Sequence, residues 1–284
     1  MEPSISYRVM TPEDVAAGLR ICRAVGWNQL SRDWELFLKL SPNDCRVAVD
    51  SSGNVTGTVT IIRYENHFSW IGMLLVDPAW QGKGVGRNLL EQALQILSSE
   101  QTVKLDATPA GREVYLKYNF VDEYTISRMM MAETNSDLKT SKVLSIDESD
   151  FPSLLKFDSQ VFGADRQTVL RWVWNTGQRF SYTARHENEI AGYCFGRRGH
   201  LYTHIGPVVA QNESVARQLV SSVLKNSPDQ PIILDVPHNK PGWMNWLQSI
   251  GFREQRVLTR MYRGTNSQPG LPEKQFAILG PEFG

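Results

Sequence analysis

The segment Gln81–Arg87 has the residue types and spacing that suit a phosphate-binding loop. It reads Gln-Gly-Lys-Gly-Val-Gly-Arg, with glycine at positions 82, 84 and 86. Because glycine has no Cβ, successive backbone N–H groups can converge on one anion, and Lys83 and Arg87 add positive charge. An apolar stretch precedes the segment and an amphipathic stretch follows it, as expected for a strand and for a helix whose N-terminus attracts anions. The alternative interpretation is an ordinary glycine-rich connection.

The glycine spacing excludes the two best-known phosphate loops. A P-loop needs two glycines five residues apart followed by Lys and Ser or Thr, and the dinucleotide fingerprint needs Gly-x-Gly-x-x-Gly. This segment has Gly-x-Gly-x-Gly-Arg. It resembles the acyl-CoA pyrophosphate loop of the GNAT superfamily of N-acetyltransferases, whose pattern is Val-x-Pro-x-x-Arg/Gln-Gly-x-Gly-x-Gly/Ala. Val76, Pro78, Gln81 and the three glycines match that pattern.

A second signature of the same family lies at Tyr115–Phe120. The family pattern is Tyr-x-Lys-x-Gly-Phe, which Tyr115, Lys117 and Phe120 match, whereas Asn119 replaces the glycine. That replacement is mild, because Asn tolerates the left-handed conformation that a helix C-terminus often requires. Taken alone, Tyr115 is better explained as a core aromatic residue on an amphipathic helix. The loop upstream favours a catalytic role.

The resemblance implies direct transfer of an acetyl group from acetyl-CoA to a primary amine of a small molecule. By analogy with the family, the backbone N–H of Leu74 polarises the thioester carbonyl, the main chain of Val76 pairs with the pantetheine arm, and Tyr115 protonates the leaving sulfur as general acid. No metal takes part. A non-catalytic CoA-binding sensor or scaffold is the alternative function. The implied cofactor-binding set is Leu74, Val76, Gln81, Gly82, Lys83, Gly84, Val85, Gly86 and Arg87.

The general base stays unassigned at this stage. Several family members carry a glutamate on the strand before the loop, where this chain has Ser-Trp-Ile-Gly-Met at positions 69–73. Glu65, His67, Asp33 and Glu35 are the nearby ionisable residues, but such residues are mostly solvated surface groups. A water chain or an amine that is already neutral are the other options.

The sequence indicates the binding site of the acceptor amine less specifically. Asn28 and Trp34 belong to a cluster of aromatic and amide side chains between the first two expected helices. Ring faces and amide groups suit the binding of an amine, so we expect these two residues to contact the substrate. Plain packing is the alternative for the tryptophan.

The elements that must position these residues follow an order that occurs twice. In the first half, Val85, Leu89, Ala93 and Leu97 repeat every four residues and predict a helix with one buried face. The other expected elements are strands at 6–9, 46–49, 55–64, 69–76 and 103–107, helices from Thr11 and over 31–40, a helix from Pro109 to about 119, and a β-rich segment over 120–131.

The second half repeats this order after a polar segment at 133–141, which we interpret as a linker. The expected fold class is therefore α/β, with two tandem GNAT folds, each a mixed, largely antiparallel twisted sheet flanked by helices. Residues 1–132 form the expected catalytic domain. Residues 142–284 form a degenerate domain with an acceptor-site or structural role, and the apolar end of the chain, Phe276–Gly284, is expected to dock against the protein.

Comparison of the two copies predicts one active site per chain. Asn212, Glu213 and Ser214 fall where the first copy has Gly82, Lys83 and Gly84, and Leu247 falls where it has Tyr115. Side chains would crowd the backbone there, and a carboxylate would face the pyrophosphate. We expect the second copy not to bind CoA in the same way.

Composition excludes several other functions. The 284 residues contain 30 basic and 30 acidic residues, so no global field attracts nucleic acid or an anionic membrane. The chain lacks both a signal peptide and an apolar run of the ~20 residues that a membrane span needs, which predicts a cytoplasmic protein. Cys22, Cys45 and Cys194 lack metal-ligand spacing and are expected to be reduced packing residues. A homodimer is compatible with the sequence.

Overall fold

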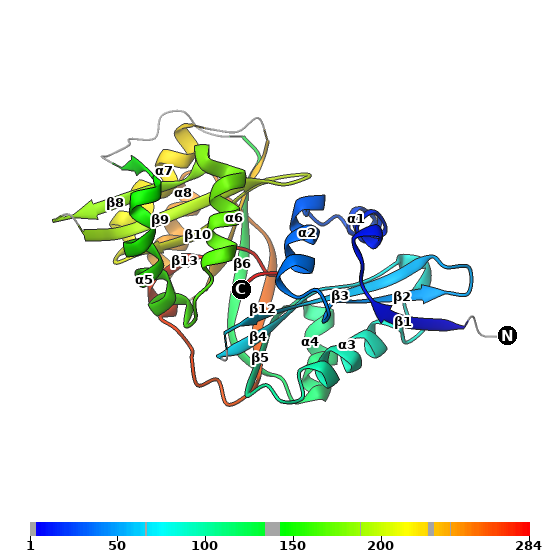
Figure 1. The fold of residues 1–284 in the computed structure, drawn as a ribbon. Helices are drawn as coiled ribbons and strands as arrows, with labels where there is room; N and C mark the ends of the chain where they lie inside the picture. The colour runs from blue at the N-terminus through cyan, green and yellow to red at the C-terminus, as the bar shows by residue number, and fades with distance from the viewer. Residues whose placement is uncertain (1–3, 66, 134–142, 188, 227–229, 239) are drawn as a thin grey trace.

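Two long strands, one from each half of the chain, lie side by side at the centre of the molecule (Figure 1). They are β6 (Val121–Met131) and β12 (Arg253–Gly264). β12 pairs with β5 (Thr102–Ala107) of the first half, and β6 pairs with β11 (Ile232–Pro237) of the second half. Each half therefore extends its sheet with a long strand from the other half.

The resulting sheet is continuous across the molecule. Its strands follow the order β1-β2-β3-β4-β5-β12-β6-β11-β10-β9-β8-β7, and β13 pairs with β10 beside this path. Most neighbours are antiparallel, but β4 and β5 are parallel, as are β10 and β11. The computed structural model describes residues 4–65, 67–133, 143–187, 189–226, 230–238 and 240–284.

The elements of the first half agree closely with those expected from the sequence. The helix α3 (Val85–Ile96) buries Val85, Leu89 and Ala93 of the predicted face, and Leu97, the residue after the helix, is buried with them. The remaining elements of this half are β1 (Ile5–Val9), α1 (Val15–Ala24), α2 (Ser31–Leu40), β2 (Arg46–Asp50), β3 (Val55–Tyr64), β4 (Phe68–Val76), α3 (Val85–Ile96) and α4 (Pro109–Tyr115), with 3₁₀ turns at Pro12–Asp14, Pro78–Trp80 and Leu116–Tyr118.

The second half repeats this order of elements, as the sequence predicts. A 3₁₀ turn and two helices precede a hairpin, a third strand and a helix. The elements are β7 (Leu144–Ser145), α5 (Phe151–Phe162), α6 (Gln167–Gly177), β8 (Tyr182–His186), β9 (Glu189–Arg198), β10 (Thr203–Ala210), α7 (Glu213–Lys225), α8 (Pro241–Ser249) and β13 (Gln275–Ala277), with 3₁₀ turns at Glu148–Asp150, Gln178–Phe180 and Pro272–Lys274.

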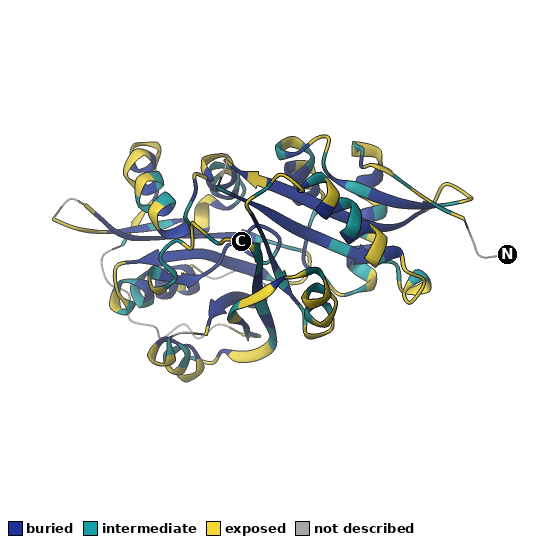
Figure 2. Cartoon of the chain, turned by 90° about the horizontal axis from the view of Figure 1, so that it is seen from below, coloured by how far each residue is buried: buried dark blue, intermediate teal, exposed yellow. Residues whose placement is uncertain are grey.

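The largest hydrophobic cluster belongs to both halves. It joins α1 and α2 to α5 and α6, and Phe283 from the end of the chain stacks on Phe37 within it. α3 packs on a separate cluster of the first half, and α7 and α8 pack on a cluster of the second. The strands are largely buried while the helices keep an exposed face (Figure 2). The two copies thus form one packed body, although each copy contains the full order of elements by itself.

Several local expectations can be checked directly. Cys22, Cys45 and Cys194 are free thiols in buried positions, as predicted. The linker at 133–141 lies almost entirely outside the described residues, so the division at 1–132 and 142–284 stays a prediction. Within the described part of the chain, no helix is long and apolar enough to cross a membrane, and no group of three or more His, Cys, Asp or Glu is placed to hold a metal ion.

Candidate active site

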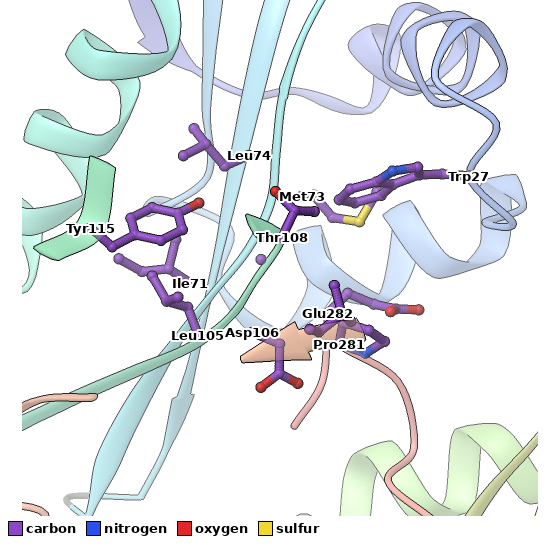
Figure 3. Close-up of a pocket in the computed structure, with 12 residues that line it drawn as sticks. Trp27, Ile71, Met73, Leu74, Leu105, Asp106, Thr108, Tyr115, Pro281 and Glu282 are labelled. Carbon is purple, nitrogen blue, oxygen red and sulfur yellow. The ribbon is translucent and has the colours of Figure 1, made fainter. Parts of the chain in front are cut away.

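A pocket of about 120 Å³ opens where β4 and β5 diverge. The two strands pair only at Ser69 with Val103 and Trp70 with Lys104, so the edges that face each other beyond this point are separated. Figure 3 shows the side chains that surround the gap. The lining residues are Trp27, Ile71, Gly72, Met73, Leu74, Leu105, Asp106, Thr108, Tyr115, Leu258, Pro281 and Glu282.

A bulge in β4 places Leu74 at this pocket. Gly72 pairs with Thr60 and Leu75 pairs with Thr58, so Met73 and Leu74 lie opposite one residue of β3. Met73 has a φ of 47°, an uncommon value for a residue with a side chain. An extra residue in one strand leaves backbone groups without a partner in the ladder. The bulge therefore takes Met73 and Leu74 out of the regular pairing beside the pocket, where the carbonyl of Met73 accepts from the hydroxyl of Thr58 over 2.8 Å.

The loop between β4 and α3 has an open row of backbone donors. Gly82 and Gly84 adopt left-handed φ values of 76° and 80°, and a Cβ at Gly82 would meet no atom within 4 Å. The first helical bond runs from the N–H of Asn88 to the carbonyl of Gly84. Among the described residues, the N–H groups of residues 82–87 have no hydrogen-bond acceptor. Such a row at a helix N-terminus is an anion site.

The side chains of the loop divide into structural and exposed groups. Val85 is buried and Gly86 lies against Val76, so these two residues can face a ligand only with their main chain. The Gln81 amide donates to the carbonyl of Val76 over 3.3 Å. Lys83 lies 4.7 Å above the ring of Trp80. Arg87, at the start of α3, pairs with Glu91 one turn later.

Tyr115 ends α4 and lines the pocket across from β4. Thr108 caps this helix by accepting from the N–H of Gly111. Asn119 ends the 3₁₀ turn Leu116–Tyr118 that follows, and its φ of 62° confirms the left-handed conformation expected of that residue. The hydroxyl of Tyr115 points into the pocket on the side of Leu74 (Figure 3). It makes no hydrogen bond to any residue that the structure describes. Burial raises the pKa of Tyr115 to about 12, so the phenol stays protonated in the neutral range.

Two carboxylates line the pocket, and both are paired with arginines. The two oxygens of Asp106 accept from Arg260 of β12, each over 2.9 Å. Oε1 of Glu282 accepts from Arg197 of β9 over 2.7 Å. Figure 3 shows both carboxylates directed away from Tyr115. Neither group is therefore placed to bind a cation at the centre of the pocket.

The two expected acceptor contacts do not lie in the pocket. Trp34 is fully buried and packs over Gly18, so it cannot touch a substrate. Asn28 uses its amide oxygen to accept from the N–H groups of Leu201 and Tyr202, which fixes a loop of the second half. Trp27, the residue directly before Asn28, lines the pocket instead. The contacts of the acceptor amine therefore stay a prediction, and the sequence did not indicate that the ring of Trp27 faces the pocket.

The ionisable residues near the loop in sequence also lie elsewhere. Asp33 is buried, accepts from the N–H of Leu30 and faces Arg197. Glu65 accepts from the N–H of Asp165, and His67 contacts the carbonyl of Gly163, so both hold a loop of the second half. Glu35 lines a different groove, between α2 and α6. None of these groups contacts the pocket, and no general base is identified among them.

The end of the chain supplies a wall that the sequence did not locate. The tail, residues 276–284, docks as predicted, and Pro281 and Glu282 reach the pocket. Trp70 donates from its indole N–H to the carbonyl of Pro281 over 2.9 Å. A Cβ at Gly72 would lie 2.9 Å from the carbonyl oxygen of Glu282, so the tail touches the backbone of β4. The apolar composition of the tail was the only signal of this contact.

The second half has the same strand divergence but no open gap. β10 and β11 pair only at Thr203 with Ile232 and His204 with Ile233. Beyond them, β13 pairs with β10, and the N–H of Ile278 donates to the carbonyl of Asp235 on β11. The tail therefore fills the space that corresponds to the pocket of the first half.

The bulge and the loop of the second half have also lost their donors. Ile205 and Val208 flank the bulge in β10, so Pro207 stands where the first half has Leu74. Proline has no backbone N–H. Asn212 caps α7, the side chain of Glu213 pairs with Arg217, and Leu247 is buried in the core. The donor, the glycine loop and the phenol are all present in the first half alone.

Comparison with known proteins identifies related sequences for both halves. A family model described as the acetyltransferase (GNAT) family matches residues 17–120, and one described as an acetyltransferase (GNAT) domain matches residues 154–277. The chain is 28% identical over 229 residues to holothin acyltransferase of Pseudoalteromonas sp. (strain SANK 73390), which covers 80% of this chain and 77% of that relative.

Two further proteins are similar over almost the whole chain. An uncharacterized N-acetyltransferase of Bacillus subtilis (strain 168), YitH, is 23% identical over 85% of this chain and 86% of its own length. The crystal structure of a putative acetyltransferase from Pyrococcus horikoshii superimposes with a TM-score of 0.84 at 23% identity, over 99% of this chain and 96% of that chain. This last likeness shows the fold.

Proposed function

Because the chain belongs to the GNAT family of acetyltransferases, with a family domain in each half, we propose that its first half transfers an acetyl group from acetyl-CoA directly to the primary amine of a small molecule. One observation carries this proposal. The bulge at Leu74 and the phenol of Tyr115 line one gap between β4 and β5, and the loop with the open N–H groups of residues 82–87 follows β4 in the chain. At the corresponding positions of the second half, none of these three features is present.

The loop and β4 supply the proposed cofactor contacts. The N–H groups of residues 82–87 bind the pyrophosphate, and Lys83 and Arg87 add positive charge around it. In this proposal the main chain of Val76, which lies beyond the pairing of β4 with β5, pairs with the pantetheine arm. This places the thioester near Leu74, whose N–H would stabilise the negative charge that develops on the carbonyl oxygen.

The chemistry then needs one nucleophile and one acid. The lone pair of the amine nitrogen attacks the thioester carbon, and a tetrahedral intermediate forms. The carbon–sulfur bond breaks, the sulfur takes the proton of the Tyr115 hydroxyl, and the amide nitrogen loses its extra proton to water. The Tyr115 phenolate regains a proton from solvent before the next turnover. A phenol with a pKa of about 12 is available as a proton donor at neutral pH, and an apolar surrounding also raises the pKa of the leaving thiol.

Release of free thiol from acetyl-CoA across an amine library tests the proposal. Turnover with an amine, lost in Tyr115→Phe while acetyl-CoA still binds, is the expected result. Tight binding of acetyl-CoA with no turnover for any amine would support a sensor or scaffold instead. Release of thiol that is unchanged in Tyr115→Phe would refute the role of the phenol.

The second half has a supporting role in this proposal. Its gap between β10 and β11 is filled by the tail, and Pro207 removes the equivalent donor. We therefore propose that it binds no acetyl-CoA. Its contribution to the reaction is the tail itself, which it holds against the first half.

A further inference from the structure

The composition of the pocket wall limits which amines the site accepts. We infer that the acceptor is a weakly basic amine on a flat apolar body, and that the tail is the wall that selects it. This inference rests on the proposed acetyl transfer in the first half. It deepens that proposal by naming the class of amine and the segment that recognises it.

The first argument is the apolar character of the lining. Trp27 lies across the pocket from Tyr115, with Met73 beside its ring (Figure 3). Ile71, Leu105, Leu258 and Pro281 complete an apolar enclosure of about 120 Å³. A pocket of this size and lining favours a compact body that can lie against an aromatic ring.

The charges of the pocket lining disfavour acceptors with a second positive charge. An acceptor with a second positive charge needs an anionic partner in a buried pocket. The carboxylates of Asp106 and Glu282 are already paired with Arg260 and Arg197. No other carboxylate is among the described residues that line the pocket. Every carboxylate of the described lining is therefore already bonded to an arginine, which disfavours polyamines and other multiply charged acceptors, although Glu282 shares Arg197 with Asp33.

The proton of a charged amine must be removed before the amine can attack the thioester. An alkyl amine with a pKa near that of lysine, about 10.4, is almost entirely charged at neutral pH and must lose a proton before it can attack. No unpaired base lines the described pocket to remove that proton. A weakly basic amine is neutral in solution and needs no base. A described pocket lining without an unpaired base is therefore suited to an amine that is already neutral.

The tail that forms the wall is held at several points by both halves. In the second half, Trp243 donates to the carbonyl of Phe276 and Arg197 donates to the carbonyl of Leu279, each over 2.9 Å. In the first half, Trp70 donates to Pro281 and the hydroxyl of Tyr64 donates to Phe283. These bonds fix Pro281 and Glu282 against β4. They make the second half a positioning device for the acceptor pocket.

Three amines test the substrate class. 5-Aminoindole and tryptamine share one ring but differ in the basicity of the amine, and spermidine carries several charges. With saturating acetyl-CoA at pH 7, we expect kcat/KM for 5-aminoindole to exceed that for tryptamine by on the order of 10², because only about one tryptamine in 10³ is neutral. A rate with tryptamine or spermidine that equals or exceeds this rate, or turnover of none of the three, would overturn the inference.

Binding of acetyl-CoA, measured by calorimetry on the same protein, separates this inference from the proposed function. If acetyl-CoA does not bind, the proposed function itself fails. If it binds and spermidine is the better acceptor, only the substrate class fails.

A pair of tryptophan substitutions tests the role of the tail. Trp70→Phe keeps an aromatic ring but removes the bond to Pro281, whereas Trp174→Phe is the matched control, because the indole N–H of Trp174 has no partner among the described residues. Loss of one hydrogen bond of about 1 kcal/mol should raise the KM for 5-aminoindole about fivefold. The kcat and the KM for acetyl-CoA should change less than twofold. Equal amine KM values in the two variants, or a parallel rise in the KM for acetyl-CoA, would refute the role of the tail.

Discussion

The proposed chemistry depends on two residues, of which one acts through its side chain and the other through its backbone. Tyr115 acts through its side chain, and Leu74 acts through its backbone, so only the former can be removed cleanly by substitution. The structure places both at the pocket, as it does the Trp27 ring. The sequence indicated Tyr115 through its position before Lys117 and Phe120. It could not indicate Met73 with its φ of 47°, because a bulge depends on pairing with a distant strand.

Replacing Tyr115 by Phe removes one oxygen atom and leaves the ring packed on Phe120, whose ring centre lies 5.8 Å away. We expect kcat to fall by about 10² to 10⁴, the usual contribution of a general acid, while acetyl-CoA affinity changes little. Steady-state kinetics and calorimetry measure the two quantities. A variant with near wild-type kcat would show that the sulfur receives its proton elsewhere.

The raised pKa of Tyr115 also predicts a pH profile. An acid catalyst is active while it is protonated, so a pKa of about 12 gives no loss of activity from Tyr115 below about pH 10. At the low end, kcat/KM should rise with pH until the acceptor amine itself is neutral. The pH dependence of the wild-type enzyme with two amines of different pKa checks this. A falling limb between pH 7 and 9 that is common to both amines and absent in Tyr115→Phe would contradict it.

At the scale of elements, the loop between β4 and α3 is the feature that the sequence predicted best. Its glycines, the helix after it and the apolar spacing of α3 are all local patterns. The destination of the tail was not predictable in the same way. An apolar segment must be covered by other residues. The residue types in 276–284 do not indicate which surface covers them, first the gap between β10 and β11 and then the pocket.

A glycine pair in the left-handed region tests the loop. Gly82→Glu places a carboxylate among the open N–H groups, whereas Gly53→Glu makes the same change in the turn between β2 and β3. Both positions have positive φ and no atom within 4 Å of a new Cβ, so both variants should lose a similar ~1–2 kcal/mol of stability. Only Gly82→Glu should weaken acetyl-CoA binding, by at least about tenfold in calorimetry. Equal affinity in the two variants would move the cofactor site elsewhere.

At the scale of the whole molecule, the exchange of β6 and β12 makes the halves depend on each other. The sequence predicts two units of similar order, and the structure has that order. Alternation and length indicate that a segment is a strand but not which strand it pairs with. For this reason the pairing of β12 with β5, and of β6 with β11, was not foreseen.

The ion pair between Arg260 of β12 and Asp106 of β5 tests this dependence. Arg260→Met leaves a buried carboxylate without its partner, which should lower the free energy of unfolding by about 3–5 kcal/mol. Arg112→Met, which breaks an exposed pair with Asp122, should cost about 0–1 kcal/mol. Urea unfolding should show one transition in each protein. Two separate transitions in the wild type, or equal losses in the two variants, would indicate halves that fold independently.

The stoichiometry of acetyl-CoA binding tests the central claim most directly. The claim is that each chain has one cofactor site, in the first half, beside a second half whose gap is filled by the tail. Titration calorimetry of the wild-type protein should therefore give one acetyl-CoA per chain. Two molecules per chain, or one that still binds with unchanged affinity in Gly82→Glu, would contradict it.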